Sequence, residues 1–242
     1  MSTETVETAL RATMIAAAEQ QLVSSDDQDV ATRAVCEAVG VSQPVLYRLF
    51  GDKRGLLDAV ADAGFERYAA LKAAQPASGD PIADLRAGWD QHMEFARANP
   101  ALYQLMFAPR PRAHSVARQR IFGLLEAQLV RCAAVGALRT EPAVAAQLIL
   151  SANVGVALNR IAQPDLFDDP ALSVRMRDAV FSAVLTAPVP IADGEPPARA
   201  AARRLRSQLQ VTGTDALAPA EAGLLDLWLD RIVSLEPGGG TS

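Results

Sequence analysis

Prolines divide this chain of 242 residues into segments of helical length. Between the prolines, Ala, Leu, Arg and Glu dominate, and no segment alternates β-branched with polar residues as a half-buried strand would. Because proline is tolerated between helices or in a first turn, the chain is predicted to be all-α. Helices are expected over residues 4–23, 30–39, 43–50, 53–75, 82–98, 101–108, 113–136, 142–162, 171–187, 197–211 and 219–235.

Residues 29–57, DVATRAVCEAVGVSQPVLYRLFGDKRGLL, place apolar side chains where three short helices would close over a small core. Gly40 can take the left-handed conformation of a tight turn, Ser42 can cap the next helix, and Pro44 fits the first turn of that helix. Leu46 then points into the core from the second helix of the pair. This spacing predicts a helix-turn-helix.

The stretch resembles the DNA-binding domain of the TetR family of transcriptional regulators, over about residues 8–70 without a gap. The resemblance rests on GVSQPVLYRLF followed by DKRGLL in one register. It implies a three-helix DNA-binding domain over residues 1–52, followed by a larger helical effector-binding and dimerisation domain over residues 53–190. Residues 191–242 are expected to form a linker and a C-terminal helical appendage.

The resemblance implies that the second helix of the motif enters the major groove with its first turn toward the base edges. Gln43 can donate to and accept from adenine, and Pro44 offers an apolar face to a thymine methyl group. The phosphate-contacting positions of the family hold Thr32, Tyr47 and Lys53 here. The DNA-contacting residues are predicted to be Thr32, Arg33, Ser42, Gln43, Pro44, Tyr47, Arg48 and Lys53.

Charge argues against a broad basic patch. The net charge is -5, and residues 1–60 hold five Arg or Lys against nine acids, so any nucleic-acid site must be local. The acids would have to lie away from the phosphates or at helix starts. Tyr47 could instead be a half-buried core aromatic, and Arg48 a solvated side chain. Ala31 and Val45 stand where the family frequently has a hydroxyl group.

Residues 95–107, FARANPALYQLMF, resemble the ligand-binding region of one TetR subgroup. Aromatic side chains in this region are also explained as ordinary core, and His92 could point into a cavity or into solvent. Asn153 and Asn159 lie in an apolar helix, where a buried amide needs a partner from a ligand or a second subunit. The ligand pocket is predicted to include Trp89, His92, Phe95, Tyr103, Phe107, Phe122, Asn153 and Asn159.

The helices at 142–162 and 171–187 have apolar faces and, by the family resemblance, are predicted to form the interface of a homodimer. Residues 187–197 are rich in Pro, Gly and Asp, which is typical of a linker. Beyond it, the helix at 219–235 carries a large apolar stripe. Trp228 in that stripe is therefore predicted to be largely buried, on its own subunit or across the dimer.

The sequence lacks enzyme signatures. Asp26, Asp27 and Asp29 do not have the spacing of a magnesium-binding cluster, and His92 and His114 lack metal-ligand spacing. Neither a nucleophile elbow nor a phosphate-cradling glycine loop occurs. We therefore expect no enzymatic activity, no metal and no cofactor.

The start of the chain, MSTETVETAL, has two glutamates and no basic residue, unlike a secretory signal. The two cysteines lie far apart in the sequence, which suits a reducing compartment. No uninterrupted apolar run reaches the length of about 18 residues that a bilayer requires, so no membrane partner is expected. These features predict a cytoplasmic protein.

The sequence thus predicts a homodimeric TetR-type repressor that binds a palindromic operator in double-stranded DNA and is released by a small-molecule effector. The alternative is an all-helical ligand carrier or interaction protein whose N-terminal unit no longer binds DNA. A gel shift at low salt separates the two.

Overall fold

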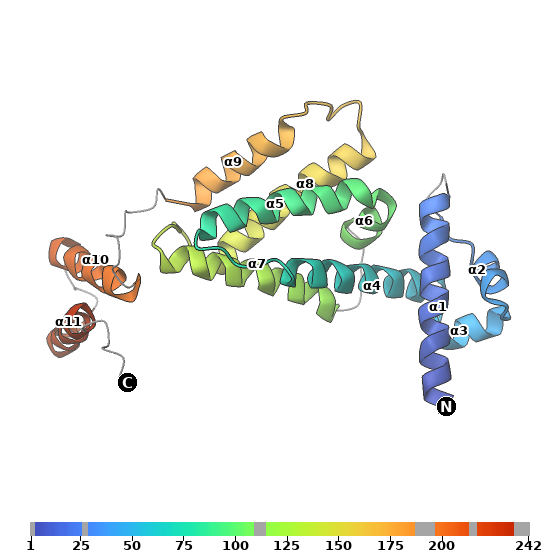
Figure 1. The fold of residues 1–242 in the computed structure, drawn as a ribbon, viewed down its shortest axis with the longest axis horizontal. Helices are drawn as coiled ribbons and strands as arrows, with labels where there is room; N and C mark the ends of the chain where they lie inside the picture. The colour runs from blue at the N-terminus through green and yellow to red at the C-terminus, as the bar shows by residue number, and fades with distance from the viewer. Residues whose placement is uncertain (1–2, 26–28, 109–114, 187–196, 213–216, 235–242) are drawn as a thin grey trace, which may run out of the picture.

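The computed structural model describes residues 3–25, 29–108, 115–186, 197–212 and 217–234. These residues form helices joined by short loops, with one isolated antiparallel bridge between Leu138 and Leu185 (Figure 1). The helices are α1 (Thr3–Ser24), α2 (Thr32–Val39), α3 (Gln43–Phe50), α4 (Lys53–Ala73), α5 (Pro81–Ala98), α6 (Pro100–Phe107), α7 (Val116–Ala134), α8 (Pro142–Ala162), α9 (Leu172–Val184), α10 (Pro197–Thr212) and α11 (Pro219–Ser234). The predicted all-α fold is confirmed, with each helix ending within a few residues of its expected bounds.

The turn between α2 and α3 has the predicted backbone. Gly40 is left-handed, at φ 74° and ψ 33°, and Pro44 lies in the first turn of α3. Ser42 occupies the N-cap position, but the side-chain cap predicted for it is absent. Pro44 has no N–H to offer, and the N–H of Val45 donates to the Ser42 carbonyl at 3.0 Å, so no nearby donor is left for the hydroxyl.

One hydrophobic core joins the N-terminal helices to the rest of the molecule along α4. Leu56 and Val60 pack with α1, α2 and α3, while Phe65 and Tyr68 belong to the same cluster further along α4. Gly64 permits the close approach of α6, because a Cβ atom at this position would lie 2.8 Å from the Met106 sulfur. The division at residues 52 and 53 therefore remains a prediction, since α4 belongs to both regions.

A second core holds α5, α7, α8 and α9 together. Trp89 is 2% exposed, packs edge-on against Phe181, and donates from its indole N–H to the Ser173 hydroxyl at 3.0 Å. By length and composition alone, α8 is apolar enough to cross a membrane, although polar residues such as Gln147, Ser151 and Asn153 interrupt its apolar run. In this fold α8 contacts α5, α6, α7 and α9 as a core helix.

The appendage pairs α10 with α11 at the end of the molecule opposite α1 to α3 (Figure 1). Arg206 of α10 forms ion pairs with Asp226 and Asp230 of α11, and Leu229 is buried. Trp228 is 53% exposed, so its predicted burial is wrong for a single chain. Apart from a few aliphatic side chains, α10 consists largely of alanines and arginines, which are too small or too polar to cover the wide stripe of α11.

Other expectations for the C-terminal region fall on parts of the chain that the structure does not describe. These are the linker at 187–196 and the last residue of the helix expected at 219–235.

The two tryptophans provide a test of this packing. In Trp89→Phe only Trp228 remains, and its fluorescence should be red-shifted and readily quenched by acrylamide because water reaches the ring. In Trp228→Phe the buried Trp89 should emit at shorter wavelength and resist quenching. Circular dichroism checks that both variants stay helical. Blue-shifted, protected emission from Trp228 would show that another surface covers α11.

Candidate nucleic-acid interface and ligand cavity

Helix α3 is buried on one side and free on the other. Leu46 and Phe50 are 0% and 8% exposed and anchor the helix in the first core. Gln43 and Tyr47 stand one turn apart and therefore share a face, on which Tyr47 is 45% exposed. The exposed residues at the start of the helix and along this side are Ser42, Gln43, Pro44, Tyr47 and Arg48. The first turn of α3 is thus accessible to a partner.

Helix α1 holds α3 in place through Arg11, a residue that the sequence analysis did not single out. Its Nη1 donates to the Leu49 carbonyl at 2.6 Å, and its guanidinium carbon lies 4.4 Å from the centre of the Phe50 ring. The contact satisfies a carbonyl in the last turn of α3, where an arginine also interacts favourably with the helix dipole. No local sequence pattern signals this pairing, because it joins positions 38 residues apart.

Two of the predicted DNA-contacting cations have acidic partners. Arg33 pairs with Glu37 at 2.9 Å, and Lys53 Nζ lies 2.5 Å from Asp29 Oδ1. The hydrogen bond from Lys53 holds the pKa of Asp29 below its usual value. Exposed pairs of this kind contribute little to stability, so a phosphate group can replace the carboxylate. Thr32, at the start of α2, is half-buried.

The acids of the N-terminal region follow the expectation in part. Asp52 caps the start of α4 by accepting from the Gly55 N–H, and Glu4 and Glu7 stand near the start of α1. Asp29 pairs with Lys53 instead of capping α2, whose N-cap is Ala31 without a side-chain cap. Asp26 and Asp27 lie outside the described residues. The local excess of negative charge is thus partly neutralised by the cations of the candidate interface itself.

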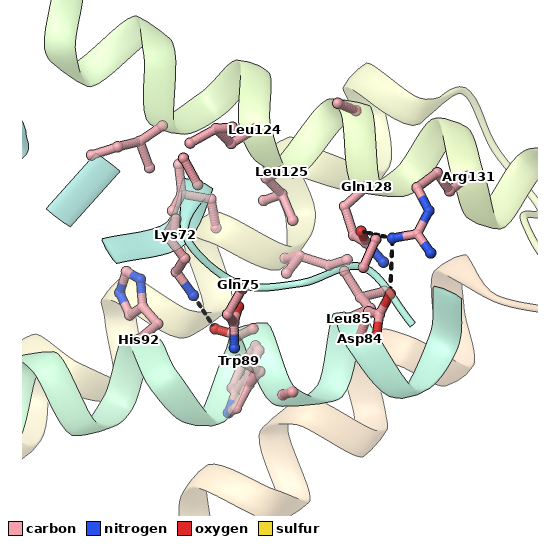
Figure 2. A pocket seen from close by; sticks show the side chains of 18 of the residues that line it. Lys72, Gln75, Asp84, Leu85, Trp89, His92, Leu124, Leu125, Gln128 and Arg131 are labelled. Atoms are coloured by element: carbon pink, nitrogen blue, oxygen red, sulfur yellow. Dashed lines mark hydrogen bonds and ion pairs between the residues drawn. The ribbon is translucent and has the colours of Figure 1, made fainter. Parts of the chain in front are cut away.

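A cavity of about 460 Å³ lies between α4, α5, α7 and α8 (Figure 2). Its volume falls in the range of pockets that hold drug-sized molecules. Its apolar wall is made by Leu85, Trp89, Ile121, Leu124, Leu125, Ile149 and Leu150. This composition suits a ligand with a largely apolar body.

Polar groups gather at two places in the cavity (Figure 2). Lys72 and His92 lie close to each other, and Asp84 with Arg131 lies further along the cavity. Arg131 Nη1 is 2.8 Å from Asp84 Oδ2 and 2.9 Å from Gln128 Oε1. Hydrogen bonds from Ser78 and Arg131 lower the pKa of Asp84, so this pair remains charged and mutually neutralised at neutral pH.

His92 is the centre of a buried hydrogen-bonded chain. Its Nδ1 lies 2.6 Å from the Tyr68 hydroxyl and its Nε2 lies 2.6 Å from the Tyr103 hydroxyl. Burial, and secondarily the nearby charge of Lys72, lowers the pKa of His92 to about 3. The neutral ring has one donor and one acceptor nitrogen, so one tyrosine donates to His92 and the other accepts from it.

The eight residues predicted for the ligand pocket divide into two groups. Trp89, His92 and Asn153 line the cavity. The other five lie elsewhere: Phe95, Tyr103 and Phe107 pack in the first core, Phe122 packs against the second core, and Asn159 is exposed. Phe107 stacks on Tyr103 with centroids 4.5 Å apart, which shows why the aromatic-rich run at 95–107 serves packing.

Several polar residues of the cavity were missed by sequence reasoning. Lys72, Gln75, Asp84, Gln128 and Arg131 line it, yet each stands near a helix end or on a mixed helix face where solvent exposure is the ordinary expectation. Lys72 had one available signal, because the chain contains only two lysines, at positions 53 and 72.

The sequence of the N-terminal region matches a known family. Residues 14–60 match the family described as bacterial regulatory proteins, tetR family. These residues run from α1 through the helix-turn-helix into α4. No curated protein matches the chain.

The fold is similar to several solved structures. A TetR-family transcriptional regulator from Pectobacterium atrosepticum is 19% identical, with a TM-score of 0.60 over 78% of this chain and 100% of that chain. A protein of unknown function from Rhodococcus sp. RHA1 is 23% identical, with a TM-score of 0.60 over 73% and 96% of the two chains. A TetR variant from Acinetobacter baumannii AYE in complex with minocycline is 23% identical, with a TM-score of 0.54 over 71% and 94%. At these identities the likeness shows the fold.

The buried histidine predicts how stability depends on pH. Because His92 titrates near 3 in the folded chain and near 6.5 when unfolded, the unfolded state binds more protons between these values. The free energy of unfolding should therefore fall as the pH drops below about 6.5, by up to about 1.4 kcal/mol per pH unit from this residue. Urea denaturation at pH 7 and pH 5 measures this loss, which His92→Gln should reduce.

His114→Gln is the matched control, because it removes the other histidine of the chain. An equal loss of stability between the two pH values in wild type and His92→Gln would show that His92 titrates normally in the folded state.

Proposed function

We propose that this chain, whose residues 14–60 match the tetR family of bacterial regulatory proteins, is a cytoplasmic homodimeric repressor that a small molecule releases from its operator. The observation that supports this most directly is α3, whose buried side is anchored in the core while its first turn is exposed. A helix held rigidly with a free N-terminal turn is what readout of the major groove requires.

In the proposed complex, Gln43 and Pro44 face base edges at the start of α3. Tyr47 extends the same face of α3 by one turn. Together with Thr32 and Lys53, it contacts the sugar-phosphate backbone of the DNA. For Lys53, phosphate binding exchanges Asp29 for another anion, so the ion pair seen in the free protein is the resting arrangement. Ser42, Arg33 and Arg48 complete the proposed contact set.

The proposed dimer forms through α8 and α9. Val144 and Leu148 of α8 are 45% and 46% exposed, and Val174 and Met176 of α9 are 45% and 39% exposed. The two helices pack against each other, so these exposed apolar side chains can form one continuous surface for a second subunit. Two copies of α3 in one dimer can then read a palindromic operator with a half-site spacing of about 34–36 Å.

Release by a ligand follows from linkage. If the cavity binds its ligand more tightly in a dimer whose two α3 helices have the wrong spacing for the operator, then ligand must weaken DNA binding by the same factor. The similar structure from Acinetobacter baumannii contains minocycline, which shows that a protein of this fold can hold a small molecule. The cavity between α4, α5, α7 and α8 is the proposed site here.

A ligand carrier without DNA binding is the second candidate. It is favoured by the acidic partners of Arg33 and Lys53, which reduce the positive charge available to phosphates. The two candidates differ in one measurement, the binding of duplex DNA by the ligand-free protein.

Substitutions on α3 and α4 should weaken operator binding in different ways. Gln43→Ala should cost about 1–3 kcal/mol of binding free energy and relax the preference at one base pair, because a base-edge contact is lost. Lys53→Ala should weaken binding to all sequences and reduce the slope of log affinity against log salt by about one. Fluorescence anisotropy with duplexes selected from a random library measures both effects.

Arg86→Ala, an exposed cation of α5, is the control and should leave affinity and salt slope unchanged. If Gln43→Ala and Lys53→Ala both kept the base preference and salt slope of wild type, α3 would not be the recognition helix.

The dimer interface is tested by placing a charge on α8. Leu148→Glu should dissociate the dimer, because burying an unpaired carboxylate in an apolar interface is unfavourable. Size-exclusion chromatography with light scattering should give twice 25.6 kDa for wild type and a mass near 25.6 kDa for the variant. Val130→Glu on α7, at a similarly exposed position, should remain dimeric. A dimeric Leu148→Glu would place the interface elsewhere.

A further inference from the structure

Lys72 brings a positive charge into a cavity that is otherwise neutral. The residue stands near the end of α4, and its side chain lines the cavity beside His92 (Figure 2). Its Nζ donates to the Gly88 carbonyl of α5 and lies 5.4 Å from the centre of the Tyr68 ring. These contacts satisfy part of the donor capacity of the ammonium group but supply no counter-charge.

The charged and titratable groups that face Lys72 do not neutralise it. On its own helix α4 the neighbour is Tyr68, and on α5 it is His92, which is neutral at physiological pH. Asp84 of α5 is paired with Arg131 of α7, and α8 contributes the uncharged Asn153. In the described part of the chain, no carboxylate oxygen lies close enough to Lys72 Nζ to form an ion pair, for which the limit is 4.0 Å.

An unneutralised ammonium group in an apolar setting is costly to the protein. Desolvation lowers the pKa of Lys72 to about 8, which is the usual response of a partly buried cation without a counter-charge. A hydrophobic residue would fill the same space without this cost, which in the empty protein only the hydrogen bond to the Gly88 carbonyl and the contact with the Tyr68 ring offset. The arrangement becomes favourable once an anion enters the cavity.

The amide of Asn153 is a second group that lacks a partner. This residue is 4% exposed and lines the cavity from α8, and its Oδ1 accepts no hydrogen bond within the described residues. Buried polar atoms are almost always hydrogen-bonded in folded proteins. A carboxylate cannot supply the missing donor, because it only accepts hydrogen bonds, so Asn153 marks a second polar position on the wall that water or a hydroxyl group would satisfy.

We propose that the cavity binds an amphipathic carboxylate, with the acid group on Lys72 and an aliphatic body along the wall formed by α5, α7 and α8. The wall supplies leucine, isoleucine and tryptophan side chains, which favour an apolar chain over a polar or multiply charged ligand. This ligand would be the effector of the proposed repressor. Binding of the carboxylate does not depend on the proposed function; only its effect on DNA binding rests on that function.

The proposal predicts a pH dependence of a definite sign. Below about pH 8 the free protein carries the ammonium form of Lys72, which the carboxylate requires. Above this value binding must take up a proton, so affinity should fall by up to about tenfold per pH unit. A neutral ligand of the same length should show no such loss, because it does not depend on the charge.

Three probes of equal chain length test the proposal on the ligand-free, full-length protein. Decanoate, decan-1-ol and decylamine share the apolar body and differ in charge. Isothermal titration calorimetry at pH 7 should rank decanoate above decan-1-ol, with decylamine weakest. Lys72→Met should weaken decanoate binding by about tenfold or more, because a charge-assisted hydrogen bond is lost, while decan-1-ol binds as well as before. Arg86→Met, an exposed cation outside the cavity, should bind all three probes like wild type.

Lys72→Met also has a readout that does not depend on ligand. Its melting temperature should equal or exceed that of wild type, since a methionine removes the desolvated charge. An unchanged preference for decanoate in Lys72→Met, no preference among the probes in wild type, or no decanoate binding at all would overturn the proposal.

Failure of the proposed function is measured separately. DNA binding by the ligand-free protein reports on the repressor proposal, whereas the calorimetric ranking reports on the ligand class. If decanoate bound through Lys72 but no duplex DNA were bound, the carboxylate proposal would stand and the repressor proposal would fall. If DNA were bound and the ranking failed, the reverse would hold.

Discussion

The continuous apolar contact along α4 is the constraint on which the other features depend. Near its start, Leu56 and Val60 pack with the helices that carry the candidate DNA-binding face. Near its end, Tyr68 and Lys72 form part of the cavity. Since packed interiors resist continuous deformation, a shift of α4 at the cavity must be transmitted to α1 and α3 or break this core. One rigid helix thus links the two candidate sites.

The cavity depends on a polar chain within this apolar core. Tyr68, His92 and Tyr103 satisfy one another, and they belong to three different helices, α4, α5 and α6. A fully satisfied buried network of this kind specifies one arrangement of its helices, because a displaced partner would leave a polar group unpaired. Burial in this core keeps the imidazole neutral beside Lys72, which leaves the ammonium group as the charge that a ligand would meet.

The appendage illustrates where amphipathic patterning stops being informative. The stripe of α11 is real, and Leu229 within it is buried, but Ile232, Leu224 and Trp228 remain between 37% and 53% exposed in the single chain. The pattern identifies a helix with an apolar side, yet the area that becomes covered depends on the partner surface. In this chain that surface is α10, which is largely alanine and arginine; the pair buries Leu229 and joins Arg206 to Asp226 and Asp230 but leaves much of the stripe exposed.

Local chemistry in the sequence by itself determined the helices, the left-handed turn at Gly40 and the exposed first turn of α3, since these depend on residues a few positions apart. Tertiary structure alone decided which side chains face the cavity. Trp89, His92 and Asn153 reach it, whereas Phe95 and Tyr103 are taken up by the core, although the sequence predicted all five for the pocket. The physical reason is that an enclosed space is defined by the relative rotation and spacing of α4, α5, α7 and α8. Those quantities follow from long-range packing, which no local pattern encodes.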